Sequence, residues 1–502
     1  MEALNVPTPR PAAARRTPLS PPDAAPGSSP LAPLVRAPGA GLAEQLAQRL
    51  AESIRLRVLG PGSRLPSVRQ AAQRHGLSTA TVVAAYDRLQ AQGLIEARPQ
   101  RGFFVRHPDD PGQRRRSPIT ALHEAAAAQP PVDATALIRG MFRASPGRLS
   151  PGIGTLPEEW LDADMLRRAL RRATQGSASS ALWLGYGEPA GDRGLREAMS
   201  QHLETLGVSA PASQIVTTVG ATHGLDIVSR CLLKPGDAVL VDEPGWAIEF
   251  ARLQRLGVCI LPVPRGPQGP QLDTLEALCR SHQPRLYVTV SVLHNPTGAS
   301  LSAASAHRIL QLADEHDFTV VEDDSYAWLA EPHVLRLSAL DGLRRTVLVS
   351  GFSKIAAPQW RVGCVAAHPA LAERLVDSKL LSTLTSPALL EQALAHCLQS
   401  GELRRHAERV RQRLAVARQR CVRMAEQAGC RFAAPPDGLF GWVDTGVDTD
   451  RLALLMHEHG WLVAPGSLFH AVRHASPLMR INFASTLDAR FWRLFEGMRA
   501  LV

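Results

Sequence analysis

The stretch SGFSKIAAPQWR, from Ser350 to Arg361, holds one of only three lysines in a chain of 502 residues. Arginine supplies the remaining 53 of the 56 basic residues. Lys354 directly follows a serine and stands seven residues before Arg361. A primary amine can condense with an aldehyde to form a Schiff base, whereas a guanidinium cannot. The retention of this lysine therefore marks Lys354 as a candidate catalytic residue.

Apolar runs alternate with helical segments through the C-terminal two thirds of the chain. This alternation predicts a mainly parallel β-sheet that is covered by helices on both faces. Ligands of such sheets bind at the strand ends, and each apolar run here is followed by a polar cluster. The runs are QIVTTVG (214–220), DAVLVDE (237–243), RLYVTVSVL (285–293), FTVVEDDS (318–325) and RTVLVSGFSK (345–354).

The polar clusters supply the parts of one cofactor site. The amides of GATHG (220–224) and the Thr222 hydroxyl can receive a phosphate at a helix N-terminus. Trp246 in DEPGW can stack on a planar ring, although a tryptophan that anchors a loop is the simpler explanation for this motif alone. Asp323 ends a buried strand and requires a cationic partner, such as a pyridinium nitrogen. Together with Lys354, these features predict pyridoxal phosphate as the cofactor.

The region from 149 to 502 resembles fold type I aminotransferases of class I and II. The resemblance implies an α/β fold with a large domain at about 180–390 and a smaller C-terminal part at about 400–502. The motifs that carry it, in family order, are YGEPAGDRGLREAM, HNPTG, EDDSY, GFSKIAAPQWRVG and MRINFA.

This resemblance also implies the role of each site residue. Lys354 would form the Schiff base with pyridoxal phosphate, Asp323 would pair with the pyridine nitrogen, and Arg480 would bind the carboxylate of an amino acid or keto acid. Gly351 stands where the family usually has a phosphate-binding Ser or Thr, so phosphate binding is expected to depend more on Arg361 or Ser353. The remaining implied cofactor contacts are Ala221 and Thr222 at the phosphate, Trp246 on the ring, Asn295 and Tyr326 at the ring oxygen, and Tyr186 from the partner subunit of a homodimer.

Residues 41–106 predict a different fold, which is a helix-turn-helix followed by a short β-hairpin. Ser67 is placed to cap a second helix, Ser78 or Thr79 to cap a third, and Gly93 to end it. LIEARPQRGFFVR then predicts two short strands that are joined by a tight turn. The apolar face of the first helix recurs every four residues, at Leu42, Leu46, Leu50, Ile54 and Val58.

The run from Leu42 to Arg106 resembles the winged helix-turn-helix domain of the GntR regulators. That family inserts a recognition helix into the major groove of double-stranded DNA and uses the wing to hold phosphates. Many members have an arginine at the position of Thr79, and some at that of Val83, so guanine readout there is not expected. The implied DNA contacts are Arg64 and Arg69, then Ser78, Thr79 and Thr81 at the recognition helix, and Arg98, Arg101 and Gly102 in the wing.

The distribution of charge agrees with a nucleic-acid partner. Residues 1–116 carry 17 arginines and 8 acids, which leaves a net charge of +1 for the rest of a chain whose total is +10. A basic segment ahead of a nearly neutral body favours a polyanion partner, and an arginine-rich composition without function is the alternative. Residues 1–40 are rich in Pro, Ala and Ser and predict a disordered leader, while residues 107–148 predict a linker.

Composition also excludes several classes of protein. No stretch of eighteen uninterrupted apolar residues or secretory signal is present, so we expect a cytoplasmic protein without a membrane partner. The seven cysteines form no C-x-x-C pair, so no metal site is expected.

A GntR domain that is linked to an aminotransferase-like domain is the layout of the MocR group of bacterial regulators, which this chain resembles. The first hypothesis is a homodimeric transcription regulator that senses pyridoxal phosphate, an amino acid or both. The alternative is a working aminotransferase that retains a DNA-binding domain, because both Lys354 and Arg480 are present. A third reading, a fold that is used only for dimerisation, predicts no cofactor and conflicts with the retained lysine.

Overall fold

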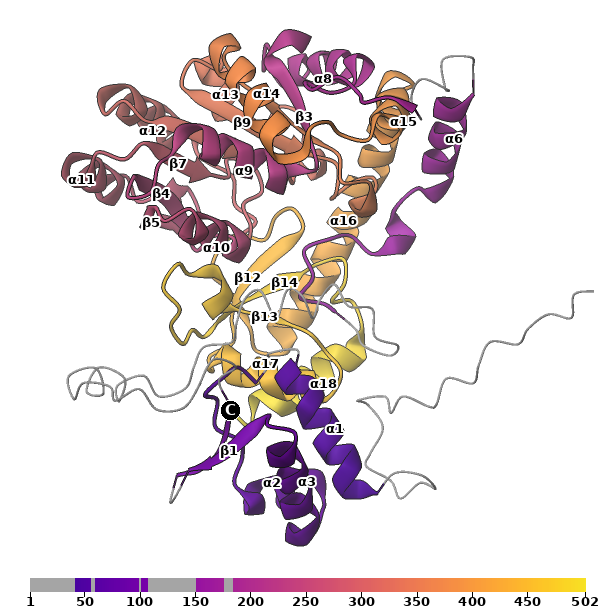
Figure 1. The fold of residues 1–502 in the computed structure, drawn as a ribbon, viewed down its shortest axis with the longest axis vertical. Helices are drawn as coiled ribbons and strands as arrows, with labels where there is room; N and C mark the ends of the chain where they lie inside the picture. Colours follow the sequence, from indigo (N-terminus) through magenta and orange to yellow (C-terminus); the bar gives the residue numbers. More distant parts are fainter. Residues whose placement is uncertain (1–40, 56–58, 99–100, 107–149, 176–183) are drawn as a thin grey trace, which may run out of the picture.

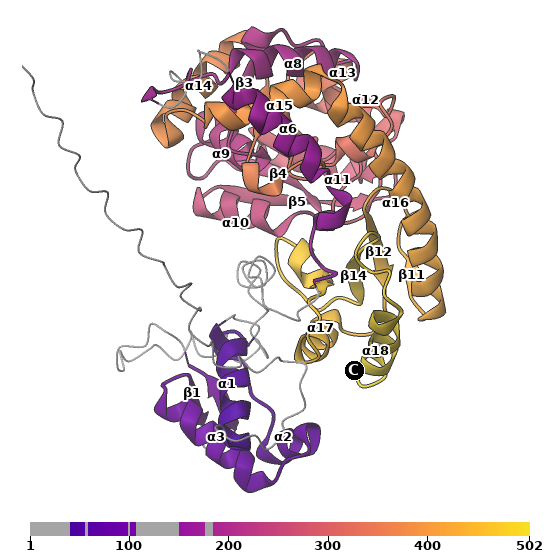
Figure 2. The same cartoon turned by 90° about the vertical axis from the view of Figure 1, so that its right-hand side faces the viewer.

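The computed structural model describes residues 41–55, 59–98, 101–106, 150–175 and 184–502. The predicted leader (1–40), the predicted linker (107–148) and Val58 lie outside these residues, and the predicted domain boundaries stay predictions. Figure 1 shows an α/β domain at the top, a small domain from β11 to α18 below it, and the N-terminal domain (41–106) at the bottom. The long helix α16 (Glu402–Gln427) runs from the α/β domain into the small domain, as Figure 2 also shows.

The N-terminal domain has the predicted helix-turn-helix. Ser67 and Gln70 form a capping box at the start of the second helix, and Gly76 ends that helix in the left-handed conformation. The cap of the third helix is Ser78, whose hydroxyl accepts a 3.1 Å hydrogen bond from the Thr81 amide. The elements are α1 (Leu42–Arg55), α2 (Val68–His75), α3 (Thr79–Ala91), β1 (Ile95–Arg98) and β2 (Gly102–Val105).

One tyrosine ties these helices to the hairpin. Tyr86 of α3 is fully buried, and its hydroxyl donates a 2.9 Å hydrogen bond to the Pro66 carbonyl. Its ring meets Phe103 of β2 edge to face at 4.9 Å. The hairpin is antiparallel with Arg98 opposite Gly102, so the predicted pair of short strands is present, while residues 99 and 100 of the predicted turn lie outside the described residues.

The α/β domain contains an eight-stranded sheet in the described part of the chain, ordered β3-β10-β9-β8-β7-β4-β5-β6. The pairs from β9 through β8, β7 and β4 to β5 are parallel, whereas β10 is antiparallel to both of its neighbours. The predicted fold class is therefore confirmed. The strands are β3 (Ile215–Thr218), β4 (Ala238–Glu243), β5 (Cys259–Gly266), β6 (Gly269–Pro270), β7 (Leu286–Thr289), β8 (Thr319–Asp323), β9 (Thr346–Gly351) and β10 (Gly363–Ala366).

Helices cover both faces of this sheet. Successive side chains point to opposite faces, so Val241 packs in the cluster with α9 and α10 while Leu240 packs with α11 and α12. The helices of this domain are α6 (Ala163–Thr174), α8 (Arg193–Glu204), α9 (Ala221–Leu232), α10 (Ala247–Arg255), α11 (Leu272–His282), α12 (Ala303–Glu315), α13 (Leu337–Asp341), α14 (Pro369–Thr383) and α15 (Ala388–Gln399), with short 3-10 turns at Glu158–Trp160, Ala212–Gln214, Ala327–Leu329 and Pro358–Trp360.

The small domain is an antiparallel sheet, ordered β11-β12-β14-β13, with helices packed against it. In Figures 1 and 2 this domain lies between the N-terminal domain and the α/β domain. Its elements are β11 (Arg431–Phe432), β12 (Phe440–Asp444), α17 (Thr449–Glu458), β13 (Ala464–Pro465), η5 (Gly466–Phe469), β14 (Leu478–Asn482) and α18 (Ala489–Arg499).

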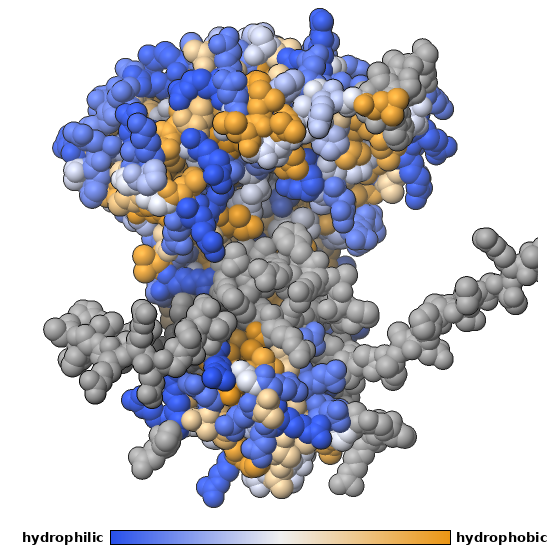
Figure 3. Space-filling model, in the orientation of Figure 1, coloured by the Kyte–Doolittle hydropathy of each residue, from blue (hydrophilic) through white to orange (hydrophobic). Residues whose placement is uncertain are grey.

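The surface mixes polar and apolar groups, and Figure 3 shows apolar side chains among hydrophilic ones on one face of the α/β domain. Within the described ranges, no helix is both long and apolar enough to cross a membrane.

One glycine allows the chain before α8 to pack against the sheet. Gly191 has a φ of 102°, and a Cβ at this position would lie 1.8 Å from the Thr217 hydroxyl. We expect Gly191→Ala to lower the free energy of unfolding by on the order of 3 kcal/mol, from backbone strain and overpacking together. Chemical denaturation followed by tryptophan fluorescence measures the change. Gly342→Ala is the control, because Gly342 has a φ of 62° but no atom within 4 Å of the added methyl group; equal losses in the two variants would refute the steric explanation.

Candidate functional site

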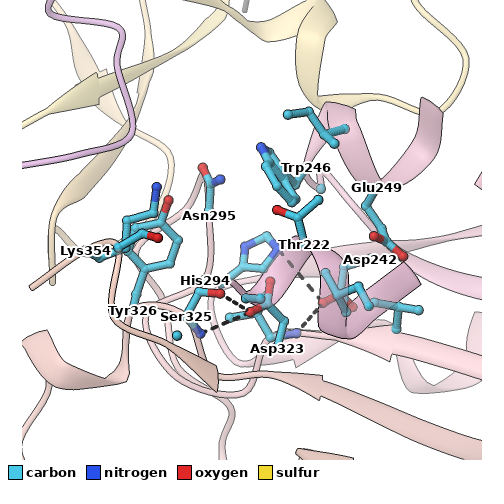
Figure 4. Close-up of a pocket in the computed structure, with 18 of the residues that line it drawn as sticks. Thr222, Asp242, Trp246, Glu249, His294, Asn295, Asp323, Ser325, Tyr326 and Lys354 are labelled. Carbon is cyan, nitrogen blue, oxygen red and sulfur yellow. Dashed lines mark hydrogen bonds and ion pairs between the residues drawn. The ribbon is translucent and has the colours of Figure 1, made fainter. Parts of the chain in front are cut away.

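The carboxyl ends of the central strands open into a cavity of about 510 Å³. Parallel strands end at the same edge of a sheet, so residues from distant parts of the chain meet there. In Figure 4, Lys354 and Tyr326 lie on one side of the cavity, Trp246 and Thr222 lie on the other, and Asp323 lies below them. The predicted site residues that line it are Ala221, Thr222, Trp246, Asn295, Asp323, Tyr326, Ser353, Lys354 and Arg361.

Lys354 stands three residues after β9 and reaches into this cavity. Burial is the main cause that lowers the pKa of its amine to about 8, and Arg480 and Arg361 act in the same direction while Asp323 opposes them. The ammonium lies 5.4 Å from the centre of the Tyr326 ring. A lowered pKa raises the fraction of neutral amine near neutral pH, which is the form that attacks an aldehyde.

Asp323 is the last residue of β8, and burial raises the pKa of its carboxyl to about 6. Ser325 opposes this shift, because its amide donates a 3.0 Å hydrogen bond and its hydroxyl a 2.5 Å hydrogen bond to Oδ1. Both bonds reach the same oxygen, so Oδ2 is left to meet a cationic partner. Ser325 stands inside the EDDSY motif, but no sequence pattern marks its contact with Asp323.

The start of α9 forms an anion cradle. Gly220 caps this helix without a side-chain hydrogen bond, so the amides of Ala221 and Thr222 stand at the positive end of the helix dipole. Arg361 lies beside this end and donates hydrogen bonds to Ser353 Oγ at 2.9 Å and to the Val219 carbonyl at 3.4 Å. The structure thus places Arg361 and Ser353 together beside the start of α9, and their role in binding a phosphate stays a prediction.

Arg480 comes from β14 of the small domain and is not among the residues that line the cavity, but it contacts Asn295, which is one of them. Its guanidinium donates hydrogen bonds to Asn295 Oδ1 at 2.7 Å and to the Gly152 carbonyl at 2.5 Å. It also lies over the rings of Phe440 and Phe469, at 4.4 and 5.0 Å from their centres. Burial lowers its pKa to about 10, and Nε has no hydrogen-bond partner in the described part of the chain. This arrangement leaves Arg480 able to bind a carboxylate.

A buried polar network supports the cavity below Trp246. The Asp242 carboxylate accepts hydrogen bonds from Arg265 at 2.7 Å, from Tyr287 at 2.6 Å and from Thr289 at 2.8 Å. His294 lies 3.9 Å from the same carboxylate, and burial holds the pKa of this histidine well below its usual value. These bonds fix the strand ends, although Arg265 Nε and Nη2 have no hydrogen-bond partner in the described part of the chain, and we assign the network a structural role.

Tyr186 is the one predicted cofactor contact that this chain does not bring into its own cavity. Its side chain is 85% exposed, and the following Gly187 packs near Ala388 at the start of α15. A role for Tyr186 therefore requires a second subunit.

The predicted DNA contacts lie on exposed parts of the N-terminal domain, except that Thr81 is half-buried. Ser78 and Thr79 stand at the start of α3, and the Arg64 guanidinium lies close to Gly102 at the hairpin. Arg98 is already engaged, because its guanidinium pairs with Glu96 at 2.8 Å and covers the Phe104 ring at 4.7 Å. Arg69 and Arg101 are exposed.

Comparisons with known proteins give two family matches along this chain. The family model "Aminotransferase class I and II" matches residues 152–496, and the model "Bacterial regulatory proteins, gntR family" matches residues 42–105. The chain is 26% identical to the uncharacterized HTH-type transcriptional regulator YisV of Bacillus subtilis, over 89% of this chain and 93% of that protein. It is 29% identical to the uncharacterized HTH-type transcriptional regulator YjiR of Escherichia coli, over 89% and 96% of the two chains.

Similar enzymes match a smaller share of this chain. A 2-aminoadipate transaminase of Thermus thermophilus is 30% identical, over 58% of this chain and 77% of the enzyme. The crystal structure of LysN, an α-aminoadipate aminotransferase from the same organism in complex with N-(5'-phosphopyridoxyl)-L-leucine, superposes with a TM-score of 0.66 at 25% identity, over 73% of this chain and 96% of that one.

The hydroxyl of Ser325 gives a sharp test of the site. We expect Ser325→Ala to raise the pKa of Asp323 above about 6, because the carboxylate loses one of its donors. Protonated Asp323 cannot pair with a pyridinium, so binding of added pyridoxal phosphate, followed by fluorescence across a pH series, should weaken at a higher pH in the variant than in the parent protein. The loss at neutral pH should be about 1 kcal/mol, or roughly fivefold. Ser325→Thr keeps the hydroxyl and is the control; an unchanged pH profile in Ser325→Ala would contradict the assignment.

Proposed function

Because the chain belongs to the aminotransferase class I and II family and carries a GntR-family domain ahead of it, we propose that it is a DNA-binding transcription regulator. Its C-terminal part binds pyridoxal phosphate and senses this cofactor, an amino acid or both. The observation that carries the proposal is the joining of a complete winged helix-turn-helix to a cavity that contains Lys354, Asp323 and an anion cradle. Its partner is double-stranded DNA, so we place its action in the cytoplasm.

The cavity fits pyridoxal phosphate by its donor set. When bound, this cofactor supplies an aldehyde that condenses with amines and a pyridine ring that withdraws electrons. Lys354 offers a partly neutral amine, and Asp323 offers a carboxylate whose Oδ2 can meet the ring nitrogen. The cradle at Ala221 and Arg361 suits the phosphate, and Trp246 suits the ring face. Arg480 would then hold the carboxylate of an amino acid that shares the cavity.

A working aminotransferase is the second candidate function. Lys354 can accept and return a proton at its amine nitrogen, and Arg480 can orient a substrate carboxylate, so both groups that turnover requires are present. The similarity to a transaminase over 58% of this chain favours this candidate. The N-terminal domain and the similarity to HTH-type regulators along 89% of the chain favour regulation.

We propose a homodimer in which Tyr186 reaches the cofactor of the partner subunit. Four large apolar side chains of the α/β domain are exposed near the start of α15, where Gly187 packs against residues 386–388. Such a group of exposed apolar residues is a natural interface between copies of a chain. The four are Leu184, Tyr186, Leu381 and Leu384.

Lys354→Ala tests the cofactor assignment. The parent protein loaded with pyridoxal phosphate should show the visible absorbance band of the lysine-bound cofactor, and the variant should lack it while remaining folded by circular dichroism. Lys234→Ala, which changes a lysine outside the cavity, is the control and should keep the band. Retention of the same band in Lys354→Ala would refute the role of this lysine.

The same spectrum separates the two candidate functions. Each L-amino acid is added singly to the loaded parent protein, and a keto acid follows. A shift of the band without loss of the cofactor aldehyde supports a sensor. Conversion to the amine form of the cofactor, reversed by the keto acid, supports the aminotransferase.

Arg69→Ala tests the DNA contact. We expect binding to a duplex from the upstream region of the chain's own gene to weaken by about 1 to 3 kcal/mol, because a cation at the duplex is lost. Fluorescence anisotropy at several salt concentrations measures the change. Arg88→Ala is the matched control, since Arg88 pairs with Glu44 inside the domain at 3.3 Å; equal effects of the two substitutions would remove Arg69 from the interface.

A further inference from the structure

The N-terminal domain rests on the small domain through an ion pair. Arg74 in the last turn of α2 places Nε 3.0 Å from Oε2 of Glu458, the last residue of α17, and each side chain is 35% exposed. Burial raises the pKa of Glu458 while Arg74 opposes that shift, and burial with Arg74 and His459 lowers the pKa of the adjacent His75. A pair that is partly withdrawn from water is screened less by salt than a surface pair. We call this Arg74–Glu458 contact the docking point of the N-terminal domain on the small domain.

The opposite end of α17 is bound to the segment beside the ligand cavity. Thr449 Oγ1 accepts a 3.1 Å hydrogen bond from the Gly466 amide, and Asp450 Oδ1 accepts a 2.6 Å hydrogen bond from the Ser467 hydroxyl. These donors belong to η5, whose last residue, Phe469, lies under the Arg480 guanidinium. Arg480 is thus connected to the start of α17 through one short turn.

The same turn is also attached to the loop that carries Trp246. The Gly245 amide donates a 2.8 Å hydrogen bond to the Phe469 carbonyl, and the Ala471 amide donates a 2.9 Å hydrogen bond to Glu243 Oε1. His470 Nδ1 lies 3.6 Å from that carboxylate. Trp246, proposed to stack on the cofactor, and Arg480, proposed to bind the ligand carboxylate, are therefore both connected to η5: the first through Gly245 and the second through Phe469.

We infer that α17 mechanically connects the ligand cavity to the N-terminal domain, with η5 at one end and the Arg74–Glu458 pair at the other. This inference rests on the proposed function. A ten-residue helix is about 15 Å long and rigid on that scale, so a movement of η5 reaches Glu458 as a displacement of the docking point. Figure 1 places α17 between the N-terminal domain and the strands β13 and β14, and Figure 2 shows it between that domain and β14. Because coupling between two sites is reciprocal, DNA binding would alter ligand affinity by the same factor.

The test uses full-length protein and measures one ratio, which is the affinity for DNA with ligand divided by the affinity for DNA without ligand. Affinity for a fluorescent duplex from the upstream region of the chain's own gene is determined without ligand, with pyridoxal phosphate, and with pyridoxal phosphate plus the L-amino acid that shifts the parent spectrum most. Arg74→Glu and Glu458→Arg should each reduce the change in affinity that the ligand causes by at least about fivefold. The double variant with both charges exchanged should restore it, because the pair is rebuilt.

Two controls show whether an effect comes from the lost connection through α17. The alternatives are a change of charge in the N-terminal domain and damage to the fold. Exchanging the charges of Arg88 and Glu44, an ion pair inside the N-terminal domain, should leave the ligand-dependent ratio unchanged. Ser467→Ala removes one of the two hydrogen bonds at the opposite end of α17 without touching the docking point, and it should reduce the ratio while the cofactor absorbance band is retained.

The outcomes are distinguishable. If the parent protein responds to ligand and the two single charge variants respond equally well, the connection does not run through α17, and the proposed function stands without it. If the parent protein binds DNA equally in all three conditions, the sensing function fails and the inference fails with it. Loss in the single variants with recovery in the exchanged pair supports the inference.

Discussion

The burial of Asp323 and Lys354 at one edge of the parallel sheet is the constraint on which the rest of the site depends. Burial raises the pKa of the carboxyl to about 6 and lowers that of the amine to about 8, so each group is poised for a partner that the chain does not supply. Ser325 holds the carboxylate in place at Oδ1. A protonated pyridine that bears an aldehyde answers both requirements together.

Arginine side chains surround this site, and a guanidinium cannot form a Schiff base in place of the Lys354 amine. Arg361 stands at the anion cradle, and Arg480 binds the Asn295 side chain while two aromatic rings cover its faces. Both arginines also contribute to lowering the pKa of Lys354. A chain with so few lysines can thus surround Lys354 with permanent cations, which position anions and cannot react with an aldehyde.

The small domain gives the molecule a means of communication between its ends. It supplies Arg480 to the cavity and Glu458 to the N-terminal domain, and α17 joins the two regions. A regulator needs two arrangements with different affinities for ligand or DNA, and an element that is bonded to both sites can bias such an equilibrium. A domain that carried only the catalytic groups would have no reason to bear this docking point.

The sequence by itself determined both folds and most of the cavity. A continuous apolar run places Asp323 at a strand end, Ser67 and Ser78 mark helix starts, and only an amine can do what Lys354 is proposed to do. The aromatic cover of Arg480 and the pairing of Arg74 with Glu458 were decided by tertiary structure alone. Local patterns specify elements, whereas contacts between residues far apart in the chain depend on how those elements pack, which no local pattern encodes.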